Sequence, residues 1–561
     1  MGDFLEWGET KLIQDIRGGE MLKQIVKKKT AIFLIQRYVS KLAHTVSKED
    51  FYSTFDEILG RLEEHSTGQN KNAVKVVRKA ARNGHPYVEL ARLLVQKRLS
   101  ETTRKKLVDT FFVPWIFTDK IKLRKMLEKE GFEAPWFFVI SPLKYCDLTC
   151  PGCYANADKG QVYLSFQLLN RIVSDAKKLG IKFITISGGE PFIYYDKEEK
   201  KNIIDFFRAN PDIYFQVYTN GTSLIDRDLA ERELAGRVRK KDKKAIASLE
   251  RIRKAARRNK RLYGRENIAP VLAKLGNVAP AISQEGFEEE TDKRRGEGMY
   301  LLIQNARKNL TSFGVLHGFS ITYTRENADV LTQKKLIDEI IKQDVSFGWY
   351  FIYIPKGRSP NIQLMPTPEQ RIRLRDFVWE MRNKKPIFIG DFWNDGPWVG
   401  GCIAGARKYF HIRADGKITP CVFADFSIGH IDRDFYQKGK SLKDVIQHPA
   451  FRFIREKQLE IDNKCTPCCI IDNPSILREA VEKFNLEPAL PGEEDIVRGE
   501  TAKFLDEYSE QIKKATQTFW ENLRKGKFDT ENVKLSKVIE NYEKRNKDRV
   551  YFENKVYSQT R

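Results

Sequence analysis

Short apolar runs recur through the middle of the chain, and each is followed by a stretch with the spacing of an amphipathic helix. Six such runs lie between Trp136 and Pro355: "WFFVISPL", "KFITISGGEP", "IYFQVYTNG", "VAPAISQEG", "VLHGFSITYT" and "FGWYFIYIP". Near-continuous apolar runs of this length are typical of strands that are buried on both faces, and their alternation with helices favours a parallel sheet. We therefore predict an α/β fold for this region, as an open sheet or a barrel.

The two ends of the chain have a different pattern, with apolar residues at helical spacing and few strand-like runs. The clearest amphipathic stretch of the C-terminal end is "FLDEYSEQIKKATQTFWENL". We predict a helical region over 1–135, an α/β core over 136–395, a cysteine-containing extension over 396–475 and a helical region over 476–561. The core also contains a basic helical insertion at about 236–271, with the sequence "RVRKKDKKAIASLERIRKAARRNKRLYGR".

Polar residues stand where the predicted strands end. Because parallel strands place their carboxyl ends on one edge, these residues are expected to share a rim. They are Cys146, Gly188, Gly189, Glu190, Asn220 and Ser283.

Three cysteines, Cys146, Cys150 and Cys153, fall within eight residues after the first strand. Three thiolates on one loop can bind three irons of a [4Fe-4S] cluster and leave the fourth iron open. Structural zinc is the alternative, but zinc takes a fourth ligand close by and no histidine lies near the triplet.

The Cys-x3-Cys-x2-Cys loop, followed by "GGEP" after the second strand, resembles the radical S-adenosylmethionine (radical SAM) superfamily. The resemblance implies a partial (β/α)6 barrel in which the open iron binds the amino and carboxylate groups of SAM. Reductive cleavage of SAM would then give a 5′-deoxyadenosyl radical that removes a hydrogen atom from a substrate. A reductant such as a flavodoxin or a ferredoxin would supply the electron.

The resemblance also implies which residues contact SAM. Gly188, Gly189 and Glu190 would receive its amino group, since carbonyl and carboxylate oxygens suit an ammonium. Further contacts would come from Asn220, Ser283 and Arg295, which lies twelve residues after Ser283. The sequence departs from the family at Gly152, because the residue before the third cysteine is usually aromatic; here the aromatic residue is Tyr154, just after it.

The remaining five cysteines follow the sixth strand, around the hairpin signal Asp415-Gly416. Their spacing resembles the twitch form of the SPASM extension, which implies a small β-hairpin and one auxiliary [4Fe-4S] cluster. The implied ligands are Cys402, Cys421, Cys465 and Cys468. Cys469 is spare or replaces Cys468, and structural zinc remains an alternative because four cysteines suit it well.

A net charge of +23 indicates contact with something anionic, such as RNA or an anionic membrane surface, unless the charge only solvates the molecule. The segment 21–42 has the mixed basic and apolar faces of a helix that lies on such a membrane. It favours a lipid at the membrane surface as the substrate, with a peptide, a protein or RNA as alternatives. The non-enzyme alternative is a basic nucleic-acid-binding protein with structural metal-bound cysteines.

The chain shows no apolar run of the ~20 residues that a transmembrane segment needs. Its first residues also lack the pattern of a secretory signal, so we expect a cytoplasmic protein, with peripheral membrane contact as an option. We further expect that deletion of the insertion from Arg237 to Arg265 leaves SAM cleavage intact, because the cofactor residues lie on other loops.

Overall fold

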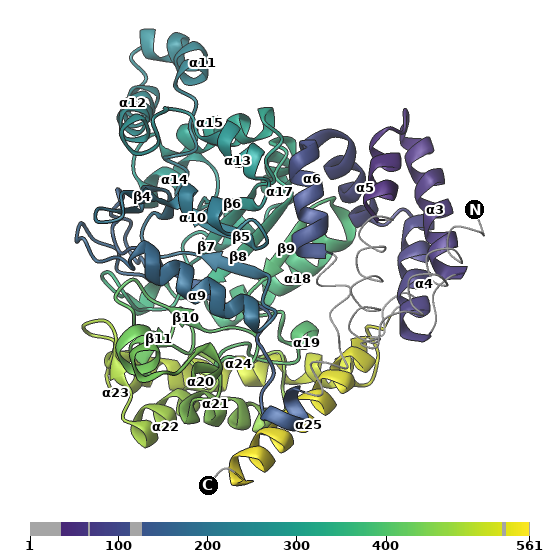
Figure 1. Cartoon of the computed structure of the whole chain (residues 1–561), viewed down its shortest axis with the longest axis vertical. Helices are drawn as coiled ribbons and strands as arrows, with labels where there is room; N and C mark the ends of the chain where they lie inside the picture. The colour runs from purple at the N-terminus through teal and green to yellow at the C-terminus, as the bar shows by residue number, and fades with distance from the viewer. Residues whose placement is uncertain (1–34, 65–67, 113–125, 530–534, 560–561) are drawn as a thin grey trace, which may run out of the picture.

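A nine-stranded sheet forms the centre of the protein. The computed structural model describes residues 35–64, 68–112, 126–529 and 535–559 (Figure 1). The strand order is β11-β10-β1-β2-β5-β6-β7-β8-β9, and every neighbouring pair is parallel except β10 and β11. The parallel core strands are β1 (Val139–Ile140), β2 (Phe183–Ile186), β5 (Tyr214–Thr219), β6 (Val278–Ser283), β7 (Gly318–Tyr323), β8 (Phe347–Ile352) and β9 (Phe388–Asp391).

Each of the six predicted apolar runs contains one of these strands, so the predicted α/β class is confirmed. Strand β9 is a seventh core strand that the sequence pattern did not reveal. The sheet order is linear and ends at β9. The structure is therefore a partial barrel that stays open.

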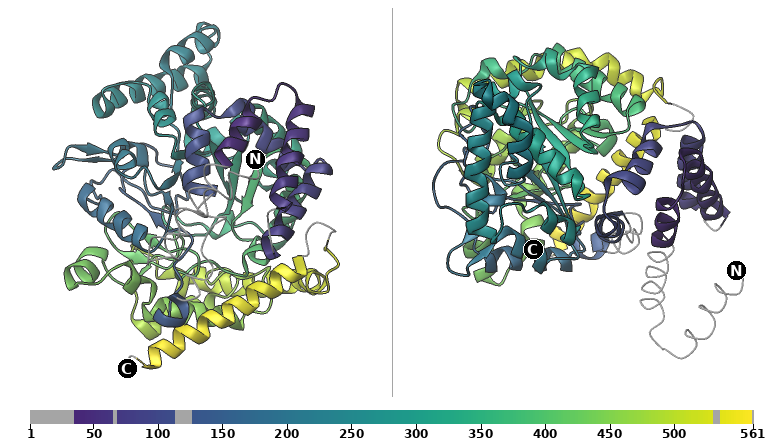
Figure 2. Two further views of the ribbon diagram at one scale, coloured as in Figure 1. Left: turned by 45° about the vertical axis from the view of Figure 1, so that its right-hand side comes forward. Right: turned by 90° about the horizontal axis from the view of Figure 1, so that it is seen from above.

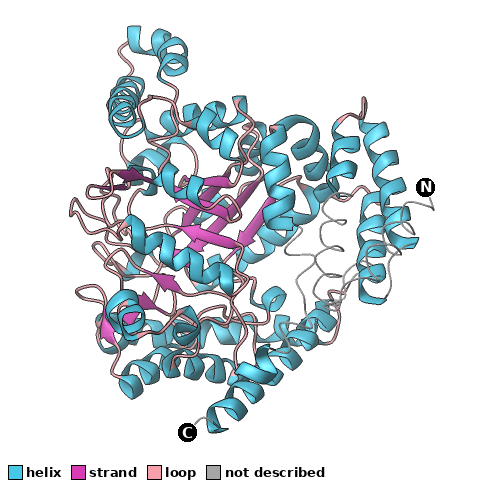
Figure 3. Ribbon diagram, in the orientation of Figure 1, coloured by secondary structure: helices cyan, strands magenta, loops and turns pink. Residues whose placement is uncertain are grey.

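Helices surround the sheet (Figure 3). The helix α9 (Phe166–Lys178) shows why these stretches fold as they do: Ser165 caps its first turn, and Leu169, Ile172, Val173 and Ala176 form one buried face. The other helices of the core are α10 (Ile203–Ala209), α13 (Ala269–Leu275), α14 (Glu288–Arg295), α15 (Met299–Ser312), α16 (Ala328–Leu331), α17 (Lys334–Lys342) and α18 (Pro368–Lys384). A short β-hairpin of β3 (Tyr195–Asp196) and β4 (Lys201–Asn202) lies between β2 and α10.

The basic insertion predicted at about 236–271 covers the end of α11 (Arg227–Arg239), all of α12 (Lys243–Tyr263) and the start of α13, and α11 and α12 form a helical hairpin. It stands out from the body of the molecule at the top of Figure 1, and the rotated view in Figure 2 shows the same projection. Asp242 caps α12, and Gly264 ends it in the left-handed conformation. The insertion is thus helical, as predicted.

The described part of the N-terminal region is also helical. Its helices are α3 (Lys48–Glu64), α4 (Gly68–Arg82), α5 (Pro86–Leu93) and α6 (Glu101–Lys106). Leu99 and Leu107 pack against Tyr214 and Ala279 of the sheet. Most of the segment 21–42, on which the membrane prediction rested, lies outside the described residues.

The cysteine-containing extension continues the sheet. Strands β10 (His411–Ile412) and β11 (Ile418–Thr419) form the hairpin predicted at Asp415-Gly416, with Gly416 at a φ of 76°. Strand β10 pairs in parallel with β1, with Val139 opposite His411. The auxiliary hairpin and the core therefore share one sheet.

Helices cover this extension and complete the C-terminal region, which follows the lower edge of Figure 1. They are α19 (Gly396–Val399), α20 (Leu442–Ile446), α21 (Pro449–Glu460), α22 (Pro474–Phe484), α23 (Asp495–Arg498), α24 (Glu500–Arg524) and α25 (Leu535–Gln559). A two-stranded sheet joins β12 (Phe426–Ser427) to β13 (Glu487–Pro488). Within the described residues, none of the helices has the length and apolar character to cross a membrane.

Candidate active site

The glycine pair after β2 lies directly against the start of the cysteine loop. The amide of Gly189 donates to the carbonyl of Leu143 at 3.0 Å, and the amide of Glu190 donates to the carbonyl of Tyr145 at 2.8 Å. A Cβ on Gly188 would lie 2.6 Å from the Leu143 carbonyl oxygen, and one on Gly189 would overlap the Tyr145 carbonyl. Only glycine permits this approach, which brings the end of β2 next to Cys146.

Glu190 joins the ends of β2 and β5. Its buried carboxylate accepts hydrogen bonds from the Thr219 hydroxyl at 2.7 Å, the Asn220 amide at 2.7 Å and the Phe192 amide at 3.1 Å. Burial, together with the nearby Asp147 carboxylate, raises the pKa of Glu190 to about 7. Glu190 therefore fixes the backbone of this rim.

The first cysteine has polar groups around its sulfur. The Cys146 Sγ accepts from the Leu148 amide at 3.5 Å and lies 3.8 Å from the Asn220 side-chain nitrogen. The Cys146 pKa is raised, chiefly by burial and further by the carboxylates of Asp147 and Glu190. N–H groups of this kind stabilise a thiolate that binds a metal.

The second cysteine faces positive charge. Burial raises the pKa of Cys150, and the guanidinium groups of Arg295 and Arg294 oppose this rise. Arg294 also donates to the carbonyls of Pro151 and Gly152, each at 3.2 Å. The end of α14 therefore lies beside the cysteine loop.

Ser283 and Arg295, the two expected SAM contacts at and after the fourth predicted strand, both form hydrogen bonds with other side chains of the protein. The hydroxyls of Ser283 and Ser320 lie 2.9 Å apart. Arg295 is buried and donates through Nε at 2.9 Å and one terminal nitrogen at 2.5 Å to Glu285, whose carboxylate is also 2.9 Å from Arg294. Arg295 thus lies on the expected rim, with its guanidinium held by Glu285.

Gly152, at the position where the family usually has an aromatic residue, leaves room for a ring from another loop. Its φ is 64°, and a Cβ there would lie 2.7 Å from the ring of Tyr353, just after β8. Tyr154 points elsewhere: its hydroxyl lies 2.5 Å from that of Ser187, and its ring centroid lies 5.2 Å from that of Phe423. The aromatic ring that covers the loop at Gly152 therefore comes from Tyr353 and not from Tyr154.

Sequence reasoning missed three charged residues of this site: Glu285, Asp147 and Arg258, which donates to the Asp147 carboxylate at 2.6 Å. Asp147 directly follows the first cysteine and Glu285 lies within "SQEG", so their positions offered a signal. Arg258 offered none, because it is one of many cations in the insertion.

The five cysteines of the extension lie in two different hydrophobic clusters. Cys421, Cys468 and Cys469 are buried in one hydrophobic cluster, and Cys402 packs against it. The pKa of Cys402 is lowered to about 7, first by a hydrogen bond with Cys469. Cys465 is buried in a different cluster, with Trp520 and Leu523 among others.

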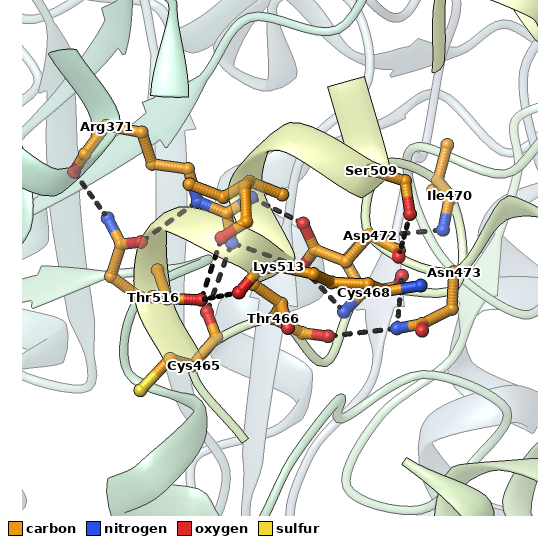
Figure 4. A network of polar contacts seen from close by, with 12 residues as sticks. Arg371, Cys465, Thr466, Cys468, Ile470, Asp472, Asn473, Ser509, Lys513 and Thr516 are labelled. Carbon is orange, nitrogen blue, oxygen red and sulfur yellow. Dashed lines mark hydrogen bonds and ion pairs between the residues drawn. The ribbon is translucent and has the colours of Figure 1, made fainter. Parts of the chain in front are cut away.

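Polar contacts hold the loop from Cys465 to Asn473 (Figure 4). The buried Arg371 forks onto Asp472 at 2.5 and 3.1 Å, and Asp472 also accepts from the Cys468 amide at 2.9 Å. The same arginine donates to the Cys465 carbonyl at 3.4 Å. Ser509 of α24 donates to the Asp472 carbonyl at 2.5 Å, so a C-terminal helix supports the loop.

The described residues do not contain a group of three or more His, Cys, Asp or Glu side chains that converges on a single metal ion. Three thiols on one loop, with N–H donors and two guanidinium groups beside them, nevertheless suit a cluster with one open iron. The individual ligand and SAM contacts remain predictions.

Residues 140–240 match the family model of the Radical SAM superfamily. Residues 140–240 therefore form a radical SAM domain. Residues 402–469 match SPASM, an iron–sulfur cluster-binding domain, so the extension resembling SPASM is confirmed. This radical SAM enzyme therefore binds a [4Fe-4S] cluster and SAM, carries a further iron–sulfur region and needs a reductant.

Known proteins are similar to this radical SAM enzyme over most of its core. Sporulation killing factor maturation protein SkfB of Bacillus subtilis (strain 168) is 22% identical over 365 residues, which cover 63% of this chain and 71% of the relative. The crystal structure of Streptococcus suis SuiB aligns with a TM-score of 0.42 at 17% identity and covers 64% of this chain and 84% of SuiB. Native anSMEcpe with bound AdoMet and Cp18Cys peptide aligns with a TM-score of 0.42 at 15% identity, over 70% of this chain and 99% of anSMEcpe.

Proposed function

We propose that this enzyme removes a hydrogen atom from a polypeptide, with Cys146, Cys150 and Cys153 as the ligands of the SAM-binding cluster. When bound, the reduced cluster and SAM together supply the reactive species for this step. The chain's own residues bind, orient and shield these groups. The two hydrogen bonds from Gly189 and Glu190 to the start of the cysteine loop carry the cofactor part of the proposal.

Different residues of the rim would bind the amino and the carboxylate groups of SAM. The backbone at Gly188 and Gly189 approaches the cysteine loop closely enough to offer carbonyl groups to an ammonium. Arg295 uses Nε and one terminal nitrogen on Glu285, so we assign the other terminal nitrogen to the SAM carboxylate. Ser283 and Asn220 would complete the contacts.

A polypeptide substrate is supported by the curated relative and by the SPASM region. The relative is named for the maturation of a killing factor, and enzymes with SPASM or twitch extensions frequently act on peptides. The lipid alternative is less well supported. In the described end of the segment 21–42, Leu42 is buried against Phe51 and Ile58, as in an ordinary packed helix.

The first test concerns cofactor cleavage. Anaerobically reconstituted protein with dithionite and SAM is expected to form 5′-deoxyadenosine, measured by mass spectrometry. Cys150→Ala should abolish the product, because it removes one of the three iron ligands. A normal yield from Cys150→Ala would contradict the assignment of the triplet.

The second test concerns the substrate class. Peptide, lipid and RNA extracts from cells that produce the enzyme are added separately, and the rate of 5′-deoxyadenosine formation is compared with the rate without extract. We expect the peptide extract to raise the rate, and protease treatment of that extract to remove the effect. Stimulation that resists protease but is lost after lipase or ribonuclease treatment would instead favour a lipid or RNA.

A further inference from the structure

The α11–α12 hairpin is packed into the cofactor rim, although its far end projects from the molecule. Leu249 and Ile252 of α12 share a buried cluster with Leu148, which lies inside the cysteine loop. Cys146 and Cys150 both pack against this cluster. The apolar face of the insertion is therefore part of the surface on which the cysteine loop rests.

One cation of α12 reaches the rim itself. Arg258 donates to the Asp147 carboxylate at 2.6 Å, to the Ser223 hydroxyl at 2.8 Å and to the Thr222 hydroxyl at 3.2 Å. The side chains of Arg258 and Asp147 are only 15% and 19% exposed. Charge-assisted bonds in such a place are stronger than those between surface residues.

Asp147 links Arg258 to the loop after β5 and, through Asn220, to Cys146. Its carboxylate also accepts from the Asn220 side chain at 2.7 Å and the Thr222 hydroxyl at 2.9 Å. The same Asn220 nitrogen lies 3.8 Å from the Cys146 sulfur. Arg258, Asp147 and Asn220 therefore form a chain of contacts that ends at a predicted iron ligand.

The first half of α12 holds a third rim loop. Arg251 donates to the Glu297 carbonyl at 3.0 Å, and Lys244 lies 3.3 Å from Glu288. A Cβ on Gly298 would lie 2.5 Å from the Ser248 amide nitrogen, so the chain after α14 lies directly on α12. One helix of the insertion thus contacts the cysteine loop, the β5 loop and the α14 segment.

We infer that Arg258 is a positioning residue for the radical SAM site. In this inference, α12 of the insertion holds three loops in place: the cysteine loop, the loop after β5 and the segment after α14. This inference rests on the proposed cofactor site. Without Arg258, the poorly exposed Asp147 carboxylate would lack its cation beside the thiolate of Cys146, and the amide of Asn220 would be less firmly directed at the sulfur. The contacts argue against the expectation that Arg237–Arg265 can be deleted without loss of SAM cleavage.

The test compares Arg258→Gln with Arg258→Lys and with the matched control Arg253→Gln on the same helix. Arg253 forms an exposed ion pair with Glu231 at 3.0 Å, away from the rim loops. We expect Arg258→Gln to weaken SAM binding roughly tenfold, the size of one charge-assisted hydrogen bond. The dissociation constant is measured from the change in the electron paramagnetic resonance spectrum of the reduced cluster as SAM is added. Arg258→Lys should recover part of the SAM affinity, because lysine keeps the positive charge but lacks the several fixed N–H donors of a guanidinium. Arg253→Gln should bind SAM as wild type does.

A second measurement does not depend on the cofactor. Hydrogen exchange of the cluster-free chain should be faster in the peptide around Cys146 for Arg258→Gln than for wild type or Arg253→Gln. Wild-type exchange in this peptide together with wild-type SAM affinity would overturn the inference. If Arg258→Gln cannot be loaded with iron, the double variant Asp147→Asn/Arg258→Gln, which removes both charges, should recover iron; a failure to recover would also overturn it.

These outcomes are distinct from those that test the proposed function. If wild type forms no 5′-deoxyadenosine, the function fails, while the exchange measurement still decides whether Arg258 holds the loop. If wild type forms the product and Arg258→Gln behaves like wild type in both measurements, only the inference fails.

Discussion

The glycine pair at Gly188 and Gly189 shows how a single missing atom can decide whether a cofactor site forms. Both positions touch the backbone that leads into Cys146, and neither has room for a Cβ. The hydrogen bonds made by the Gly189 and Glu190 amides depend on this close approach. The pair thus has a steric role that is independent of any contact with SAM.

Gly189→Ala is expected to displace the cysteine loop and to lower the iron content after reconstitution by about half or more, since its methyl group would overlap the Tyr145 carbonyl. Gly236→Ala is the matched control, because no atom lies within 4 Å of a Cβ there and the residue is inside α11. The control should be neutral or stabilising by about 0.5–1 kcal/mol, as for other helical glycines. Wild-type iron and SAM cleavage in Gly189→Ala would show that the loop can adjust.

Residue identity alone predicted the rim but not the partners of its residues. The family resemblance implies a rim position for Arg295, twelve residues after Ser283, and in the structure its guanidinium opposes the rise in the pKa of Cys150. Its ion pair with Glu285 could not be foreseen, because the choice between a ligand and a protein carboxylate depends on side-chain direction. Arg258 and Asp147 are 111 positions apart, so only the fold brings them together.

At the scale of elements, we propose Cys469 in place of Cys465 as the fourth ligand of the auxiliary cluster, beside the predicted Cys402, Cys421 and Cys468, because these four share one packing environment. Cys402 contacts Cys469, and both share a cluster with Cys421 and Cys468. The spacing Cys-x2-Cys pointed to Cys465, but that side chain lies among the apolar residues of α24 and α25. The spacing and the packing thus point to different fourth ligands, and the two alternatives can be separated by substitution.

Cys469→Ala is therefore expected to lose the iron of the auxiliary cluster, about four atoms per chain, and Cys465→Ala is expected to keep it. Iron and zinc are measured in both variants after reconstitution, with Cys150→Ala as the reference for loss of the SAM-binding cluster. Loss of iron from Cys465→Ala but not from Cys469→Ala would support the predicted spacing instead. Stoichiometric zinc in wild type would remove the auxiliary cluster from the proposal.

The strands could be predicted where a short stretch of sequence was enough to identify them. Six apolar runs and the Asp415-Gly416 turn each gave a strand or hairpin in the expected place. Strand β9 was missed because the apolar run in "KPIFIGDF" is only three residues long, from Ile387 to Ile389, before Gly390 interrupts it. The pairing of β10 with β1 joins residues far apart in the chain, which periodicity does not report.

At the scale of the whole molecule, α25 forms hydrogen bonds both with the segment before β1 and with the cysteine-containing extension. In α25, Glu553 is buried and accepts from Arg549 at 2.8 Å and from Arg455 at 3.0 Å. Arg549 also donates to the Arg407 carbonyl at 2.9 Å and the Glu133 carbonyl at 3.1 Å. The loop after Cys402 and the entry to β1 therefore depend on one C-terminal contact.

Glu553→Gln should lower the free energy of unfolding by about 3–5 kcal/mol, because it leaves two buried guanidinium groups without their carboxylate. The midpoint of thermal unfolding of the protein is compared with that of Glu540→Gln, an exposed position on the same helix that should have little effect. An equal response of the two variants would show that the buried pair is not important for stability.

The buried cations also change the meaning of the net charge of +23. Arg98 donates to the carbonyls of Val345 and Ile341. Arg407 donates to those of Val399, Gly401 and Cys402. Part of the positive charge is therefore buried and hydrogen-bonded to the backbone inside the protein. Composition counts such residues as if they faced solvent. The charge is thus a weaker sign of an anionic partner than the sequence indicated.

The pairing of β10 with β1 bears on how this enzyme could be divided or recombined. Strand β1 has hydrogen-bonded neighbours on both sides, and one of them belongs to the iron–sulfur extension. A fragment that stops near residue 395 would leave the backbone of Val139 and Ile140 unpaired along one edge, and such edges readily recruit strands from other molecules. Any exchange of the SPASM region with that of a related enzyme would have to bring its own edge strand in register, or the recipient would aggregate before its chemistry could be assayed.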